Sequence, residues 1–442
     1  MIYKKSSDFL MLFLWVVLSI LFIVNEYSLT TVSDKGVFFA VLGIGIIVFI
    51  LIAVNKASLI SLLIICLNVL LVPILIQYYT GHSYGILSIS HVTLHISEVI
   101  NNLYLYDSVL LILSFVFNFS GHEKVLWNSS FLEDEQFTIW IRNFIALIFA
   151  IVAFPRGFGQ VSADERFDML LPGKAWNQLS VVALLFNLPY LKKSHSVRLT
   201  YLLVIFWFLS HGERADIAGI FAGLIFYWLA TQKKGIFNNG ILKKFVILLF
   251  GFVLVALLGC VGYIRIYHVI PDIRELLLNL LTTATISDVA YLFNVSIDYG
   301  LSIGHTNGQI LITNILSAIP FFKQKTGFTD IINGLYPNPG GEPLLAEPIM
   351  DFGMVSLPII GVLDFFFFFI FLRSGNKFFK YEFLVLLCSI PRIVWYGRSY
   401  VFSSVLFFVP FIYCLSLLLN KHKKKISEKN GELLLNSSSK TI

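Results

Sequence analysis

The chain has 442 residues, of which 57% are hydrophobic and only 13% are charged, well below the roughly 25% charged residues of a soluble domain. This composition excludes a soluble globular protein and predicts an all-α integral membrane protein. The net charge of +6 does not indicate a nucleic-acid partner, because the lysines gather between apolar runs, as they do in the cytoplasmic loops of membrane proteins.

Apolar runs long enough to cross a bilayer recur from end to end, so residues 1–420 are predicted to form one polytopic membrane domain. The first run has the shape of a signal peptide but lacks its cleavage site, and we interpret it as an uncleaved span. The basic segment 421–442 is predicted to be a cytoplasmic tail. About twelve spans of the required length are expected, at 8–25, 36–54, 57–77, 103–120, 138–155, 176–191, 199–211, 215–231, 245–264, 350–372, 381–397 and 400–420.

The distribution of basic residues predicts the orientation. With a cytoplasmic N-terminus, roughly 20 of the 32 lysines and arginines fall in inner loops, so both termini are expected inside. Arginine predominates over lysine on the outer side, and its planar fork suits bidentate binding of phosphate or carboxylate. The outer arginines are therefore candidates for binding an anionic ligand: Arg156, Arg166, Arg214, Arg265, Arg274, Arg392 and Arg398.

Two outer loops stand out by length and charge. Residues 265–349 form a loop of about 85 residues, and ordered loops of that length are usually functional. Within it, 266–281 and 287–301 have helical periodicity with acids on one side and are expected to lie along the membrane interface. The stretch 304–341 is rich in glycine, proline and asparagine. The second outer loop, 156–175, carries both arginines and acids.

The large loop ends in an acidic, turn-rich segment, 337–353, that runs into an apolar span. Glu342 and Glu347 have no lysine or arginine within about ten residues on either side, so a local surface ion pair does not explain them. Desolvation beside the span would raise the pKa of Glu347 toward neutral pH. The alternative is a carboxylate stabilised by the N-terminal dipole of the following helix.

Three stretches resemble the oligosaccharide repeat-unit polymerases of O-antigen and capsule assembly, the Wzy family. The loop 304–325 leads from Gly304-His305-Thr306-Asn307-Gly308 to an Ile-Pro pair and a lysine. The segment 345–353 has small residues, a glutamate and then Phe-Gly at the start of a span. The segment 212–216 resembles the arginine-containing start of a middle span. The spaced Arg-to-Gly repeat of some members is absent.

The resemblance implies a bundle of the GT-C type, with about twelve spans and a large extracytoplasmic loop, in the bacterial inner membrane. The implied substrate is an undecaprenyl-diphosphate-linked oligosaccharide, joined into polymer on the outer face. The implied partners are membrane lipid and a chain-length regulator, and no cofactor is implied.

This reaction needs a base for the acceptor hydroxyl and cations for the departing diphosphate. The candidates for the base are Glu347, Glu342, His305 and Asp351.

Among the arginines, Arg214, Arg265 and Arg274 are the preferred diphosphate ligands. Arg214 could instead pair with neighbouring acids, and the other two could snorkel at helix ends. Arg392 and Arg398 lie near the outer end of span 381–397, where a charge close to hydrocarbon is expensive and often functional.

Arg156 and Arg166 could equally form surface pairs with the acids between them. His91 and His95 are four residues apart but have no third ligand at a metal-like spacing, so no metal site is predicted.

Two other classes share this composition. A secondary transporter or flippase usually has two similar halves and short loops, whereas the large loop here occurs once. A ligase that moves finished polymer onto an acceptor would share the loop and the arginines, and the residues do not distinguish it.

Overall fold

The computed structural model describes residues 34–55, 58–81, 85–88, 92–128, 131, 134–154, 176–231, 260, 269, 272, 284–319, 327–338 and 340–421. The predicted spans 8–25 and 245–264, the loop 156–175 and the predicted helix 266–281 lie outside these residues, apart from the isolated positions 260, 269 and 272. The regular elements of the described residues are helices, with one isolated parallel bridge between Glu342 and Tyr396.

The helices before the first long undescribed stretch are α2 (Asp34–Asn55), α3 (Leu59–Asn68), α4 (Leu71–Thr80), η1 (Gly85–Ser88), α5 (Ile96–Val116), α6 (Phe119–Asn128) and α7 (Gln136–Ala153). The middle of the chain forms α9 (Trp176–Phe186), η2 (Leu188–Tyr190), α10 (His195–Ser210) and α11 (Arg214–Thr231). The last part forms α14 (Ala284–Ser302), α15 (Gln309–Ser317), α16 (Phe328–Asn333), α17 (Ala346–Phe352), α18 (Ser356–Arg373), α19 (Lys377–Tyr396), α20 (Ser399–Ser403) and the π-helical turn η3 (Ser404–Phe408).

Six of the described helical segments are long and apolar enough to cross a membrane, which confirms the multi-pass helical class. They are Gly36–Asn55, Leu59–Thr80, Ile96–Val116, Gln136–Ala153, Ser356–Arg373 and Ser399–Lys421. Two shorter apolar helices, α9 and α10, accompany them. The total of about twelve spans and the GT-C architecture remain predictions.

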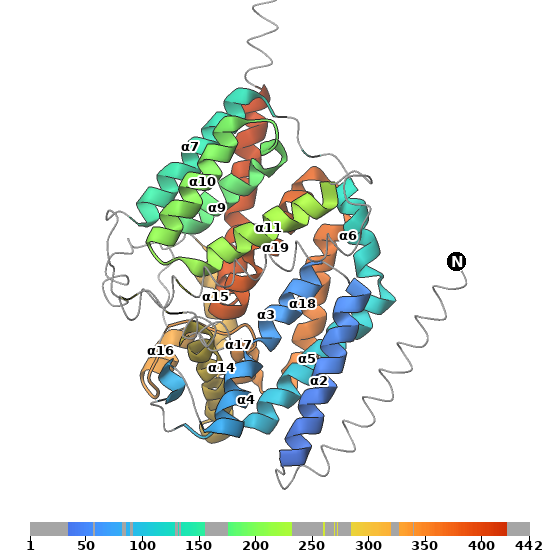
Figure 1. The fold of residues 1–442 in the computed structure, drawn as a ribbon, viewed down its shortest axis with the longest axis vertical. Helices are drawn as coiled ribbons and strands as arrows, with labels where there is room; N and C mark the ends of the chain where they lie inside the picture. Colours follow the sequence, from blue (N-terminus) through green and yellow to red (C-terminus); the bar gives the residue numbers. More distant parts are fainter. Residues whose placement is uncertain are drawn as a thin grey trace, which may run out of the picture.

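The helices pack into two groups around two hydrophobic cores (Figure 1). One core joins α2, α3, α4, α5, α14, α17 and α18, and the other joins α7, α9, α10 and α11. Helix α19 contributes to both: Phe383 and Leu387 face the first core, while Leu384 and Cys388 face the second. The two groups are therefore held together through α19.

Helix α11 approaches α19 closely because of two glycines one turn apart, Gly219 and Gly223. A Cβ atom built on Gly219 would lie 1.7 Å from the backbone oxygen of Cys388, and one on Gly223 would lie 2.3 Å from the Cys388 Sγ. Small residues at this spacing let two membrane helices come into backbone contact.

The segment predicted to form the large outer loop contains three helices among its described residues. Helices α15 and α16 form within 304–341, and α14 corresponds to the predicted helix 287–301. This helix is covered by neighbouring helices, because residues such as Tyr291, Phe293 and Val295 are fully buried. Its position along the membrane interface remains a prediction. Its acidic side chains form hydrogen bonds within the protein. Asp288, for example, accepts a hydrogen bond from the Ile86 backbone N–H.

Two predicted span boundaries are also wrong. Helix α5 begins at Ile96 rather than at residue 103. The predicted span 350–372 is divided at Gly353 into α17 and α18. Gly353 has φ +77°, and a Cβ there would lie 2.9 Å from the His305 ring, so a glycine is needed at this break.

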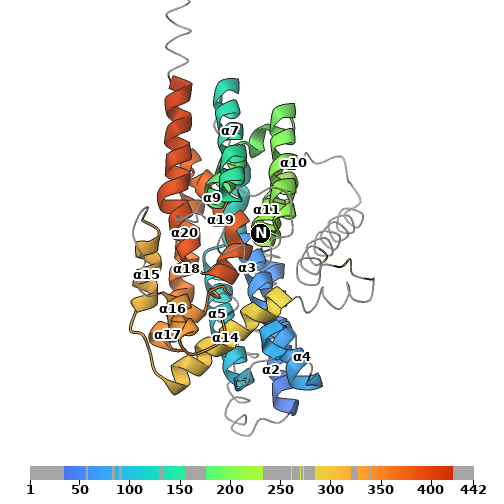
Figure 2. The ribbon, with the colours of Figure 1, turned by 90° about the vertical axis from the view of Figure 1, so that its left-hand side faces the viewer.

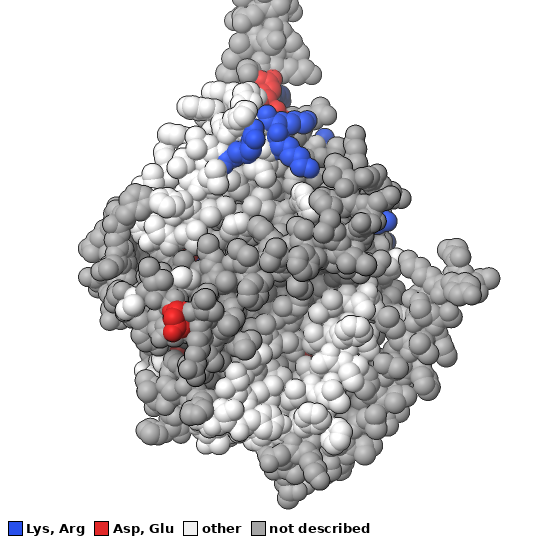
Figure 3. All heavy atoms as spheres, in the orientation of Figure 1, with Lys and Arg blue, Asp and Glu red and all other residues white. Residues whose placement is uncertain are grey.

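Exposed basic side chains gather at the top of the molecule in the view of Figure 3. Lys192, Lys193 and Arg198 lie in and beside the turn before α10, and Lys421 ends the last helix. All four belong to segments that the sequence predicts to be cytoplasmic.

We expect Gly219→Ala to lower the melting temperature of the detergent-solubilised protein, because the added methyl group forces the α11 and α19 backbones apart. A cost of about 1–3 kcal/mol is typical of such overpacking, and thermal unfolding measures it. Gly45→Ala is the matched control, since a Cβ there has no neighbour within 4 Å. Equal melting temperatures for the two variants would contradict the close crossing.

Candidate functional site

The candidate site forms around Arg398, which lies between α19 and α20 and is 6% exposed. Its guanidinium donates to both carboxyl oxygens of Asp364, at 2.6 Å from Nη2 and 3.3 Å from Nε. Nη1 donates to the Leu344 carbonyl at 2.8 Å and lies 3.5 Å from Oε1 of Glu347. One buried cation therefore connects α18, α20 and the segment that ends the large loop.

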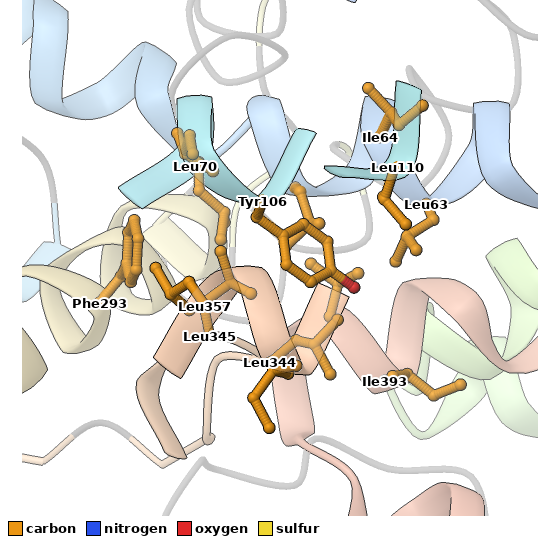
Figure 4. Packing of buried hydrophobic residues seen from close by; sticks show 14 of the residues in the cluster. Leu63, Ile64, Leu70, Tyr106, Leu110, Phe293, Leu344, Leu345, Leu357 and Ile393 are labelled. Atoms are coloured by element: carbon orange, nitrogen blue, oxygen red, sulfur yellow. The ribbon is translucent and has the colours of Figure 1, made fainter. Parts of the chain in front are cut away.

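Asp364 is fixed from the opposite side by Tyr106 of α5, whose hydroxyl donates to Oδ2 at 2.9 Å. The Tyr106 ring is fully buried, and Figure 4 shows it among Leu344, Leu345 and Leu357 with its hydroxyl at the edge of this apolar group. The apolar packing sets the position of the ring, and the ring sets the orientation of the carboxylate.

Glu342 and Glu347 lie side by side and share one donor. Nδ2 of Asn314, on α15, donates to Oε1 of Glu342 at 2.6 Å and to Oε2 of Glu347 at 2.7 Å. Glu342 is 9% exposed, while Glu347 and Asn314 are each 1% exposed. The acids that have no basic neighbour in the sequence thus form a buried pair next to Arg398.

The backbone before α17 holds this pair against the end of α19. The Glu342 N–H donates to the Trp395 carbonyl at 3.1 Å, and the Leu344 N–H donates to the Val394 carbonyl at 3.0 Å. Gly397, with φ +80°, leaves room for the Glu342 side chain, because a Cβ there would be 2.9 Å from Cδ of that residue. The turn at the end of α19 and the acidic segment therefore fit together closely, through two backbone hydrogen bonds and the space left by Gly397.

The environment raises the pKa of both glutamates. Burial raises the pKa of Glu342 to about 8, and the nearby Glu347 adds to the effect, while Asn314 and Arg398 oppose it. Burial also raises the pKa of Glu347, against the opposing charge of Arg398. Two adjacent buried carboxyls cannot both ionise at low cost, so the pair retains a proton near neutral pH.

A second ionic cluster forms around Arg392, in the last turns of α19. Its Nη1 donates to Glu213 and, at 3.1 Å, to Asp216. The guanidinium lies 5.0 Å from the ring centroid of Tyr396 and 4.9 Å from that of Tyr400. Asp216 also accepts from Tyr400, so this cluster fixes α11 to α19 and α20.

Asp351 and His305 lie apart from the glutamate pair. Asp351 accepts from the Thr306 hydroxyl and from the N–H groups of Ile310 at 3.1 Å and Leu311 at 2.8 Å. It is fully buried and acts as the N-terminal cap of α15. The His305 ring packs against Gly300 and Gly353. Neither side chain is placed to serve as the base beside Arg398.

Most of the other arginines predicted to bind the diphosphate cannot be placed at this site. Arg214 begins α11, and its charge lowers the pKa of Asp288 on α14, which burial raises to about 6. The acids expected to pair with Arg214, Glu213 and Asp216, are the partners of Arg392. Four candidates lie outside the described residues: Arg156, Arg166, Arg265 and Arg274.

Sequence reasoning missed Asn314, Asp364 and Tyr106. Asp364 carried a signal, because a carboxylate within the apolar run of α18 is costly unless it has a partner. Nothing in the sequence distinguishes Asn314 from the other asparagines of its loop. Tyr106 resembles the many other aromatic residues of the spans.

Within the described part of the chain, no group of three or more histidine, cysteine, aspartate or glutamate side chains is arranged to hold a metal ion. Comparison with protein-family models, with curated proteins and with solved structures gave no match. The site is therefore interpreted from its own chemistry.

The raised pKa of Glu342 predicts a pH-dependent stability. The folded state holds a proton that the unfolded state loses above its ordinary pKa of 4.5, so stability falls as the pH rises from about 4.5 to about 8. Glu342→Gln cannot ionise, and we expect it to be more stable than wild type at pH 9 by roughly 2 kcal/mol, with little difference at pH 5.

Thermal unfolding at both pH values measures this. The control is Glu98→Gln, at the partly exposed start of α5. An equal effect of Glu342→Gln at pH 5 and pH 9 would contradict the retained proton.

Proposed function

We propose that this protein polymerises undecaprenyl-diphosphate-linked oligosaccharide repeat units on the outer face of the bacterial inner membrane, yielding O-antigen or capsular polysaccharide. The observation that carries the proposal is the buried Glu342–Glu347 pair in contact with Arg398. It joins a proton acceptor and a cation within a multi-pass membrane protein, which are the groups that transfer from a lipid diphosphate requires.

In the proposed reaction, the acceptor hydroxyl attacks the anomeric carbon of the first sugar on the lipid diphosphate. A lone pair of the hydroxyl oxygen forms the new C–O bond, and the bond to the diphosphate oxygen breaks with its electron pair leaving on that oxygen. The hydroxyl proton passes to Glu347. No cofactor takes part, and atoms and charge balance between the carboxylate, the proton and the diphosphate anion.

Glu347 suits the role of base better than Glu342. Among the described residues, its Oε1 has only the long 3.5 Å contact to Arg398, whereas Arg398 binds Asp364 at 2.6 Å. The Arg398–Glu347 contact is thus the easiest part of the cluster to open, and opening it frees a carboxylate and a guanidinium N–H together. A general base of this kind contributes about 10²–10⁴-fold in rate.

Arg392 supports the proposal as a second cation on the same helix. Its Nε is buried and has no acceptor in the described structure, although Nη1 binds two carboxylates. An unused guanidinium donor suits a phosphate oxygen. Arg398 and Arg392 are therefore the proposed diphosphate ligands among the described arginines.

The test is deletion of the gene, with complementation by variants. Loss of the protein should reduce the surface polysaccharide to single repeats on its acceptor, and wild type should restore the ladder of long chains. Glu347→Gln, expressed at wild-type level in the membrane, should restore roughly 1% or less of the long chains, while Arg373→Gln, an exposed residue at the far end of α18, should restore the full ladder.

A persistent ladder in the deletion strain would contradict polymerisation. Acceptor without any repeat would indicate a ligase or a lipid-linked oligosaccharide flippase instead. A full ladder with Glu347→Gln would remove Glu347 from the mechanism.

A further inference from the structure

Asn314 is the one side chain that contacts both glutamates of the pair among the hydrogen bonds of the described residues. Its amide nitrogen carries two hydrogens, and one points to each carboxyl group at 2.6 and 2.7 Å. All three side chains are at most 9% exposed. The amide therefore fixes the separation of the two carboxyl groups in the buried interior of the protein.

The charges around the pair do not balance if both glutamates ionise. The two shortest hydrogen bonds of the Arg398 guanidinium go to Asp364, at 2.6 Å, and to the Leu344 carbonyl, at 2.8 Å. Its contact with Glu347 is longer, at 3.5 Å. Three carboxyl groups then share one guanidinium, and a buried excess of negative charge is costly. The ionisable groups whose charges act on the pair are Arg398, Asp351 and Asp364.

The position of Asn314 is itself fixed by the cap of α15 and by the packing of this helix. Asp351 caps the first turn of α15 through the N–H groups of Ile310 and Leu311. Figure 2 shows α15 lying along α20 above α17, and α15 packs against both of these helices. The cap thus holds in place the helix that presents the amide, which gives Asp351 a structural task.

We infer that Asn314 is a positioning residue that holds Glu342 and Glu347 as a unit sharing one proton, with Glu342 protonated and Glu347 ionised beside Arg398. This inference rests on the proposed function for its catalytic meaning, because the ionised member is the proposed base. The amide donates to both members and so stabilises the ionised form. Removing it raises the pH at which the pair loses its proton.

The first test needs no activity. Infrared difference spectra of the purified, membrane-reconstituted protein report the carboxylic acid C=O band of the pair, which is assigned by its loss in Glu342→Gln. In Asn314→Ala this band should persist to a higher pH than in wild type, by about one pH unit. The matched control is Asn294→Ala, which removes another 1% exposed asparagine that binds the Thr93 carbonyl and the His95 N–H.

The second test is the pH profile of chain elongation by the reconstituted protein. Asn314→Ala should shift the acidic limb to higher pH, with roughly tenfold less product below the limb and recovery above it. Asn294→Ala should alter the yield at all pH values alike. In the Glu342→Gln background Asn314 still donates to Glu347, so adding Asn314→Ala should shift the limb in the same direction but by less than in wild type.

The outcomes separate the two claims. An unchanged carboxylic acid titration in Asn314→Ala, or the same shift in Asn294→Ala, would overturn the positioning role. A shifted titration in a protein whose deletion leaves the polysaccharide ladder intact would support the proton-sharing unit and reject the polymerase.

Discussion

A single buried guanidinium, that of Arg398, determines how the last third of the described chain is assembled. It binds Asp364 of α18, the Leu344 carbonyl and Glu347 of α17 from a position between α19 and α20. A charge removed from water is tolerated when opposite charges and hydrogen bonds replace the solvent. The end of the large loop and the glutamate pair are in direct contact with this guanidinium or next to it.

Helix α19 connects this cluster to the rest of the protein. It is buried along most of its length, lies against the glycine pair of α11 and contributes to both hydrophobic cores. Arg392 near its end and Arg398 just beyond it are the two cations that bind carboxylates of three helices, α11, α17 and α18. The apolar packing of α19 and the ion pairs at its end therefore fix the position of the same helix. A shift of α19 would move both arginines away from their carboxylate partners.

The sequence was sufficient for the helical membrane class and for the approximate positions of the six candidate spans among the described residues. It also singled out Glu342, Glu347, Arg392 and Arg398, which the structure places in two buried ionic clusters. It failed where partners come from distant segments: Glu347 looks unpaired because Arg398 is 51 residues away, and Asn314 has no distinguishing local pattern. The composition of 304–341, rich in glycine, proline and asparagine, did not reveal α15, which is stabilised by tertiary contacts such as the Asp351 cap. Helical periodicity in 287–301 was right, but periodicity does not reveal that a helix will be covered by other helices.

The dependence on Arg398 is tested most directly by a double-mutant cycle with Asp364, read by thermal unfolding in detergent at pH 7. Arg398→Met leaves buried carboxylates without their cation and should cost about 3–5 kcal/mol. Adding Asp364→Asn removes one of those charges, and the double variant should be more stable than the two separate costs predict, by roughly 1–3 kcal/mol. Simple addition of the two costs would show that the residues do not interact, and would contradict the central place given to Arg398.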